Sequence, residues 1–294
     1  MAHIDRASIV AFMHRWAQLQ NAGELLAHAA LYAPGFAASE RAGELTTPFD
    51  LTGWLEHRRR TLAPGARVLV PGLEILRGDG VVAVVIEPRN VTAALSDGDK
   101  TTLLLERAGE SWRILREDVI QDEGPRHARG PCATLLGQLA SAGASVQYFA
   151  NLAGAGATAP RWAAVSSHDD ADGRSDDGYV WELWALLRSS AGEIASVSRA
   201  SPAGDWARQA SFCFRSDGSP LEVIDRYRTL LPDRQLVDDV VTTRYSRAAE
   251  ERSSRSLARF LVTGKPAPAD AYLRPPPLLV ERASALPFAA LMGL

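Results

Sequence analysis

The chain has 294 residues, of which 46% are hydrophobic and 23% are charged, and its formal net charge is −3. This composition is typical of a globular protein, and the length suggests two domains or one large one. Because acidic and basic residues are nearly balanced, a nucleic-acid-binding surface is not predicted.

The two cysteines, Cys132 and Cys213, are too few for a disulfide framework. They allow one disulfide, although two buried thiols are the simpler interpretation. No second Cys or His lies at ligand spacing from either of them, so we predict no metal site and no cofactor.

The first residues contain Asp5 and two histidines and lack a long apolar run, which is unlike a signal peptide. No stretch reaches about 18 consecutive apolar residues, so no membrane span is predicted. We therefore expect a cytoplasmic protein, and an extracytoplasmic one only if the true start of the gene lies upstream.

Helices are predicted at the beginning of the chain. Residues 6–21 form an amphipathic pattern with apolar side chains every three or four positions, namely Ile9, Phe12, Met13, Trp16 and Leu19. A second helix is predicted over residues 24–32, residues 37–47 are interpreted as a loop, and a third helix is predicted over residues 51–60.

Four strands are predicted to follow these helices. Residues 67–76 alternate loosely, and residues 81–86 form a β-branched run that favours burial on both faces. Two further strands, residues 100–107 and 112–119, flank the polar turn at residues 108–111. Three helices followed by strands in hairpin succession indicate an α+β fold, in which a curved antiparallel sheet covers helices.

A polar segment, residues 121–130, is the best candidate for a linker. We therefore expect one domain at residues 1–122 and a second, β-rich domain at residues 123–294. The second domain is predicted to start with a helix over residues 132–152.

The rest of the second domain is predicted to be a β-meander. Short alternating runs and Gly-containing turns follow one another from residue 180 to residue 262. The tail from Pro266 onward is rich in proline and is expected to lie extended across the surface, with Leu286 and Phe288 docking near its end.

One set of residues in the first domain follows a recognisable order. A Trp precedes a basic pair on the third predicted helix, and the closing hairpin reads Lys, apolar run, basic residue, turn, Trp, basic residue, Ile and Glu. These residues are Trp54, Arg58, Arg59, Lys100, Leu103 to Leu105, Arg107, Trp112, Arg113, Ile114 and Glu117. With this order, about the first 120 residues resemble the nuclear transport factor 2-like (NTF2-like) superfamily, which includes ketosteroid isomerase and SnoaL-type proteins.

The resemblance is closest to a bacterial branch that is appended to cell-wall transpeptidases and repeat proteins. It covers about two fifths of the chain. The sequence departs from this branch after Val85, where Glu87, Pro88, Arg89 and Asn90 replace the usual Gln and aromatic residue. The second domain resembles no family that we can name.

The resemblance implies a cone-shaped fold with a pocket at its open end, where apolar walls raise the pKa of a carboxylate. Isomerases of the superfamily use an aspartate base and a tyrosine donor. The candidates here are Glu117 or Asp118 as the base and His14 or Tyr32 as the donor. Because Glu117 and Asp118 are adjacent in a strand, they point to opposite faces. An ion pair or solvent exposure is the simpler interpretation for either acid.

Candidates for contact with a ligand are Trp16, Trp54, Arg58 and Arg89. Both tryptophans are also interpretable as core residues, and Arg58 as a cation that the C-terminal end of its helix favours. Arg89 shares a strand face with Glu87, so a salt-bridged pair is its simpler role.

The sequence therefore indicates a pocket without a complete catalytic set. We predict a non-catalytic module that binds a small molecule or a protein. The alternative is an isomerase or hydrolase that acts on a small hydrophobic substrate through a carboxylate base. A third hypothesis is a homodimer formed through the sheet of the first domain.

Overall fold

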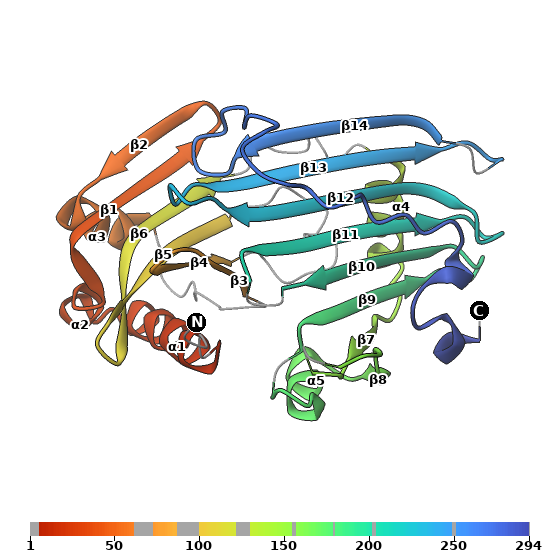
Figure 1. Ribbon diagram of the computed structural model, residues 1–294, viewed down its shortest axis with the longest axis horizontal. Coiled ribbons are helices and arrows are strands. Elements are labelled where there is room, and N and C mark those ends of the chain that lie inside the picture. The colour runs from red at the N-terminus through yellow and green to blue at the C-terminus, as the bar shows by residue number, and fades with distance from the viewer. Residues whose placement is uncertain are drawn as a thin grey trace.

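The computed structural model describes residues 6–61, 73–86, 100–121, 130–154, 157–178, 180–201, 204–248 and 251–293. Two β-sheets organise these residues (Figure 1). The first sheet curves around helices near the N-terminus, and the second, longer sheet is built from the C-terminal part of the chain. The predicted α+β class, with a cone-shaped first part and a β-meander after it, is confirmed.

Helices make up a small share of the described chain. They are α1 (Arg6–Ala22), α2 (Leu25–Ala29), α3 (Leu51–Thr61), α4 (Pro131–Ser141), α5 (His168–Arg174) and the 3-10 helices η1 (Ala283–Ala285) and η2 (Ala289–Met292). The first three correspond to the predicted helices, although α2 is shorter than predicted. The apolar positions of α1 turn toward the first sheet, because a spacing of three or four residues places them on one helix face.

The first sheet has six strands in the order β2-β1-β6-β5-β4-β3. They are β1 (Tyr32–Ala42), β2 (Leu45–Phe49), β3 (Glu74–Arg77), β4 (Val81–Ile86), β5 (Lys100–Ala108) and β6 (Ser111–Gln121). Neighbouring strands are antiparallel except β1 and β6, which are parallel. The predicted antiparallel sheet is therefore mixed at this one pair.

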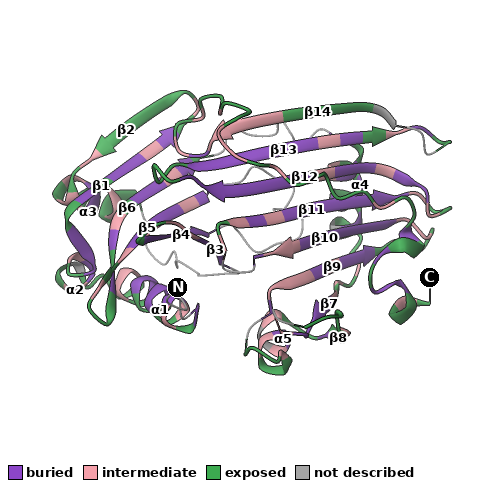
Figure 2. Cartoon of the chain, in the orientation of Figure 1, coloured by how far each residue is buried: buried purple, intermediate pink, exposed green. Residues whose placement is uncertain are grey.

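Strand β4 shows how the first sheet uses both of its faces. Val82, Val84 and Ile86 pack with the helices in the interior of the cone. Val81, Ala83 and Val85 face the other way and pack with residues of the second sheet. All six residues are buried, so the prediction of burial on both faces is confirmed (Figure 2).

The second sheet has eight strands in the order β14-β13-β12-β11-β10-β9-β7-β8, all paired antiparallel. They are β7 (Gln147–Asn151), β8 (Trp162–Val165), β9 (Glu182–Arg188), β10 (Ile194–Ala200), β11 (Trp206–Phe214), β12 (Pro220–Leu230), β13 (Leu236–Tyr245) and β14 (Glu251–Phe260). Each strand from β9 to β13 pairs with the next one in the chain, as the predicted meander requires.

Helix α4 covers one face of the second sheet, and a disulfide fixes it there. Cys132 of α4 is bonded to Cys213 of β11, and both residues are buried. The interpretation as two free thiols is therefore wrong. Packing of α4 against the sheet brings the two Cα atoms to 5.3 Å, within the range that a disulfide spans.

The C-terminal tail covers the opposite face of the same sheet (Figure 1). Phe288 stacks on Phe149 with the ring centroids 4.3 Å apart, and Leu286 is also buried. Upstream, the Arg274 guanidinium contacts the carboxylates of Asp225 and Asp239 at 3.0 and 2.9 Å. The predicted docking of the tail is confirmed.

The two sheets pack against each other through a shared apolar cluster. Its buried members are Leu76, Val81, Ala83, Val85 and Ile120 from the first sheet and Ala207, Leu230, Leu236 and Leu261 from the second part. Beside it, Arg228 of β12 pairs with Glu74 of β3 at 2.6 Å. At these residues the outer face of the first sheet, the surface proposed for a homodimer, is covered by the chain's own second sheet.

Two predicted segments have a different structure. Residues 37–47, interpreted as a loop, belong mostly to the β1–β2 hairpin, where pairing with β6 and β2 overrides a composition that is poor in strand formers. The predicted helix over residues 132–152 ends at Ser141, close to Gly143, whose φ of 69° breaks a helix. Strand β7 takes up the remainder.

Candidate functional site

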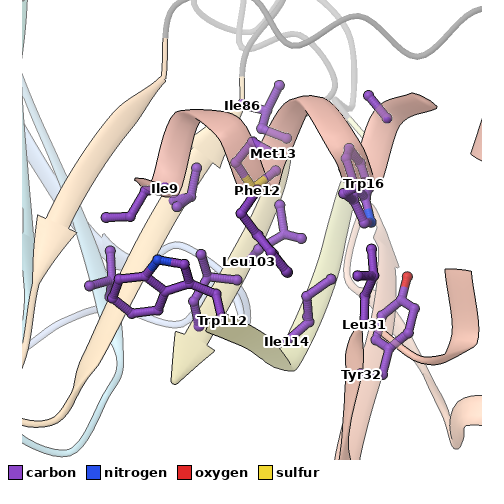
Figure 3. Close-up of a cluster of buried hydrophobic side chains, with 14 of the residues drawn as sticks. Ile9, Phe12, Met13, Trp16, Leu31, Tyr32, Ile86, Leu103, Trp112 and Ile114 are labelled. Carbon is purple, nitrogen blue, oxygen red and sulfur yellow. The ribbon is translucent and has the colours of Figure 1, made fainter. Parts of the chain in front are cut away.

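The candidate site lies in the interior of the cone, where β6 faces the helices. Phe12 and Met13 of α1 point toward Leu103 and Ile114 of the sheet, and Trp16 points toward Leu31 and Tyr32 (Figure 3). A register shift between Leu104 and Leu105 changes the alternation of β6. After this shift, Glu117 faces the cone and Asp118 faces outward.

Glu117 is fully buried and has two polar neighbours. The Tyr32 hydroxyl donates a hydrogen bond to Glu117 Oε2 at 2.8 Å. The Arg58 Nη2 atom lies 3.6 Å from Glu117 Oε1 and gives the carboxylate a nearby positive charge. Three elements therefore meet at this acid: the start of β1, the end of α3 and the second half of β6.

Two of the groups near Glu117, Tyr32 and His28, are held in their neutral forms. Burial raises the pKa of Tyr32 well above 10, and the charge and hydrogen bond of Glu117 raise it further. Burial, together with the charge of Arg58, lowers the pKa of His28 to about 4. His28 Nε2 lies 3.5 Å from the Tyr32 hydroxyl. At neutral pH the Tyr32 phenol and the His28 imidazole are therefore both uncharged.

Two buried tryptophans, Trp16 and Trp54, lie next to members of the cluster. The Trp16 ring lies 6.3 Å from the His28 ring, and the Arg58 guanidinium lies 5.5 Å from the centre of the Trp54 ring. Trp54 Nε1 and Glu117 Oε1 are buried and make no hydrogen bond to any residue that the structure describes. Leaving a buried donor or acceptor without a partner costs free energy. A ligand that supplied a hydrogen bond to either atom would recover part of this cost.

Asp118 and His14, two of the sequence candidates, lie away from this cluster. Asp118 is on the outer face, where the Ser39 hydroxyl donates to it at 2.6 Å and the Arg116 Nε atom at 2.8 Å. His14 is exposed on α1. Arg89 lies outside the described residues.

The structure brings five sequence candidates together: Glu117, Tyr32, Trp16, Trp54 and Arg58. It adds His28, which the sequence analysis did not identify. A signal was present, because His28 precedes Tyr32 by four residues at the end of a predicted helix, a spacing that places side chains side by side.

Within the part of the chain that the structure describes, no three His, Cys, Asp or Glu side chains gather as a metal site would require. None of the helices described is both long and apolar enough to span a membrane.

No protein-family model and no curated protein matches the chain. One similar solved structure is an NTF2-like protein of unknown function from Pseudomonas putida KT2440. It has 16% identity and a TM-score of 0.30, and the match covers 39% of this chain and 84% of that one. Another is an NTF2-like protein with a cystatin-like fold from Novosphingobium aromaticivorans, with 16% identity and a TM-score of 0.32, covering 45% of this chain and 88% of that one. Nothing about function follows from matches at this level.

Proposed function

We propose that this protein is a non-catalytic binding module whose N-terminal part, residues 6–121, is NTF2-like and holds a small, mainly apolar ligand with one hydrogen-bond donor. The state of Glu117 carries the proposal. The Arg58 guanidinium lies 3.6 Å from its Oε1 atom and the Tyr32 hydroxyl donates to its Oε2 atom, so two neighbouring side chains hold the carboxyl group in place. Among the described residues, no side chain or backbone group donates a hydrogen bond to its Oε1 atom, which is therefore available to a ligand.

The surroundings of Glu117 support the apolar character of this ligand. The interior of the cone is lined by Phe12, Met13, Trp16, Trp54 and Leu103, all buried. A ligand that enters must replace contacts between these side chains, which an apolar body does at the least cost. One donor on the ligand then satisfies Glu117 Oε1, and the hydrogen bond to a charged acceptor gives specificity.

The test compares phenol with toluene, which has the same shape but no hydroxyl group. We expect calorimetric titration of the wild-type protein to show phenol binding about tenfold more tightly, as one hydrogen bond to a charged group predicts. The Glu117→Gln variant should lose this preference, and the exposed Glu110→Gln variant should keep it. Equal binding of both probes, or binding of neither, by the wild-type protein would contradict the proposal.

An isomerase or hydrolase remains the second candidate, because the Tyr32 hydroxyl and Glu117 lie within hydrogen-bond distance. In such an enzyme Glu117 removes a proton and Tyr32 stabilises the developing oxyanion. Exchange of deuterium into the carbon next to the carbonyl of cyclohexanone measures this step. Exchange that depends on Glu117 would favour the enzyme over the binding module.

The disulfide supports a compartment other than the expected cytoplasm. Disulfides persist in oxidising environments and are rare where glutathione and thioredoxin keep thiols reduced. The buried bond between Cys132 and Cys213 is therefore more consistent with an extracytoplasmic location.

A further inference from the structure

A second polar site lies at the junction of the two sheets, on the outer face of the first. It is a cavity of about 60 Å³. The first sheet contributes Thr102, Arg116 and Asp118, and the second part contributes Arg234, Gln235 and Thr263. Apolar side chains, among them Leu236 and Phe260, form the rest of its wall. We infer that this cavity binds a small monocarboxylate.

The charges around the cavity favour an anion. Asp118 is already satisfied, because Ser39 donates to it and the Arg116 Nε atom contacts both of its oxygens at 3.0 and 2.8 Å. Arg234 has no carboxylate partner among the described residues. Two guanidinium groups and one carboxylate therefore leave one positive charge in excess at the cavity.

The backbone of Arg234 provides an independent observation. Its φ is 66°, the only positive φ of a non-glycine residue in the described chain. The Leu231 N–H donates to Gln235 O and the Arg234 N–H to Leu231 O, which makes a three-residue hairpin loop. The last position of such a loop is usually a glycine, because an L side chain is disfavoured there. An arginine held in a strained backbone conformation beside a cavity indicates a functional role for its side chain.

The size and lining of the cavity identify the class of anion. A volume of 60 Å³ accommodates about four to six non-hydrogen atoms, if each water-sized group needs about 10 to 15 Å³. A guanidinium group matches the two oxygens of a carboxylate. The apolar wall fits the short hydrocarbon part of acetate, propionate or butyrate, whereas inorganic phosphate has no apolar part.

The test is a titration of the full chain with sodium propionate, followed by NMR, with sodium chloride added to hold the ionic strength constant. We expect saturable shifts for the wild-type protein. The Arg234→Gly variant should bind propionate about tenfold more weakly, as expected for a lost charged hydrogen bond. The same variant should have a higher Tm, because glycine relieves the backbone strain. The Arg234→Lys variant retains the charge and should bind with intermediate affinity.

Each other outcome overturns the proposal. Absence of saturable binding by the wild-type protein contradicts the site itself. Unchanged propionate affinity in Arg234→Gly removes the role of Arg234, and a raised Tm alone then reports only a strained turn. Phosphate binding more tightly than propionate at the same ionic strength contradicts the monocarboxylate assignment.

Discussion

Two fully buried carboxylates, one in each sheet, are compensated in different ways. Glu117 in the first sheet has one cation, Arg58, at 3.6 Å, and one hydroxyl donor. Asp238 in the second sheet has Arg228 and Arg226 at 2.9 and 3.3 Å and Arg259 at 3.9 Å. Among the described residues, each has one oxygen without a hydrogen bond, but of the two only Asp238 is surrounded by several positive charges.

The difference separates a scaffold from a candidate site. Burial alone would raise the pKa of Asp238, but the charges of Arg226, Arg228, Lys100 and Arg259 outweigh it and lower that pKa far below its usual range. Asp238 is thus fixed as an anion in a network that also ties Arg228 to Glu74 of the first sheet. The cluster around Glu117 has fewer charges, and neutral groups complete it. Rearranging its contacts around a ligand should therefore cost less free energy than breaking the ion pairs of Asp238.

The largest expected effect comes from removing the charge of Asp238. In the Asp238→Asn variant three arginines lose their common anion, and breaking a buried ion pair costs about 4 kcal/mol. We expect the urea midpoint to fall accordingly, with an unchanged m-value. The exposed Glu110→Gln variant is the control and should stay within about 0.5 kcal/mol of wild type. A loss below about 1 kcal/mol would show that the network is not a scaffold.

The next effect is the pH dependence of stability, which should differ between the cluster around Glu117 and the network around Asp238. The pKa of His28 is about 4 in the folded protein and 6.5 in the unfolded chain, so the unfolded chain binds more protons between these values. Stability should therefore fall by up to about 3 kcal/mol as the pH drops from 6.5 to 4. Because the pKa of Asp238 is lowered, its contribution is lost only in more acidic solution.

The measurement is the free energy of unfolding at several pH values for wild type and His28→Leu. Between pH 6.5 and 4, the difference between the two slopes of unfolding free energy against pH gives the contribution of His28. The exposed His14→Gln variant serves as the matched control and should retain the wild-type slope. If His28→Leu also retains it, His28 is not held neutral by the cluster.

Much of the local structure followed from the sequence. The three- and four-residue spacing in α1 predicted its buried face, and the β5–β6 hairpin followed from its polar turn. Adjacent positions in a strand also implied that Glu117 and Asp118 diverge, and the structure places them on opposite faces.

The remaining features depend on the pairing of distant strands. Arg228 and Asp238 are direct neighbours in the register of β12 and β13, and Arg228 reaches Glu74 across the junction of the sheets. No local pattern gives such a register, because each acid or base looks like a surface residue in its own strand. For the same reason the parallel pairing of β1 with β6 was not predicted, although Tyr32 and Glu117 were named as candidates for one site.

The smallest effect compares the same hydrogen bond in two networks. Tyr32 donates to Glu117 at 2.8 Å in the cone, and Tyr272 of the tail donates to Asp239 at 2.6 Å on the second sheet. Tyr32→Phe should cost about 2 kcal/mol, because Tyr32 is the one hydroxyl donor that the described residues offer to the fully buried Glu117 carboxylate. Tyr272→Phe should cost about 1 kcal/mol or less, because Tyr272 is half-buried and Asp239 keeps Arg274 at 2.9 Å. Urea unfolding of wild type and both variants measures the two losses of unfolding free energy. Equal losses would mean that the carboxylate in the cone is as well compensated as that of Asp239, and the case for Glu117 as a ligand contact would fail.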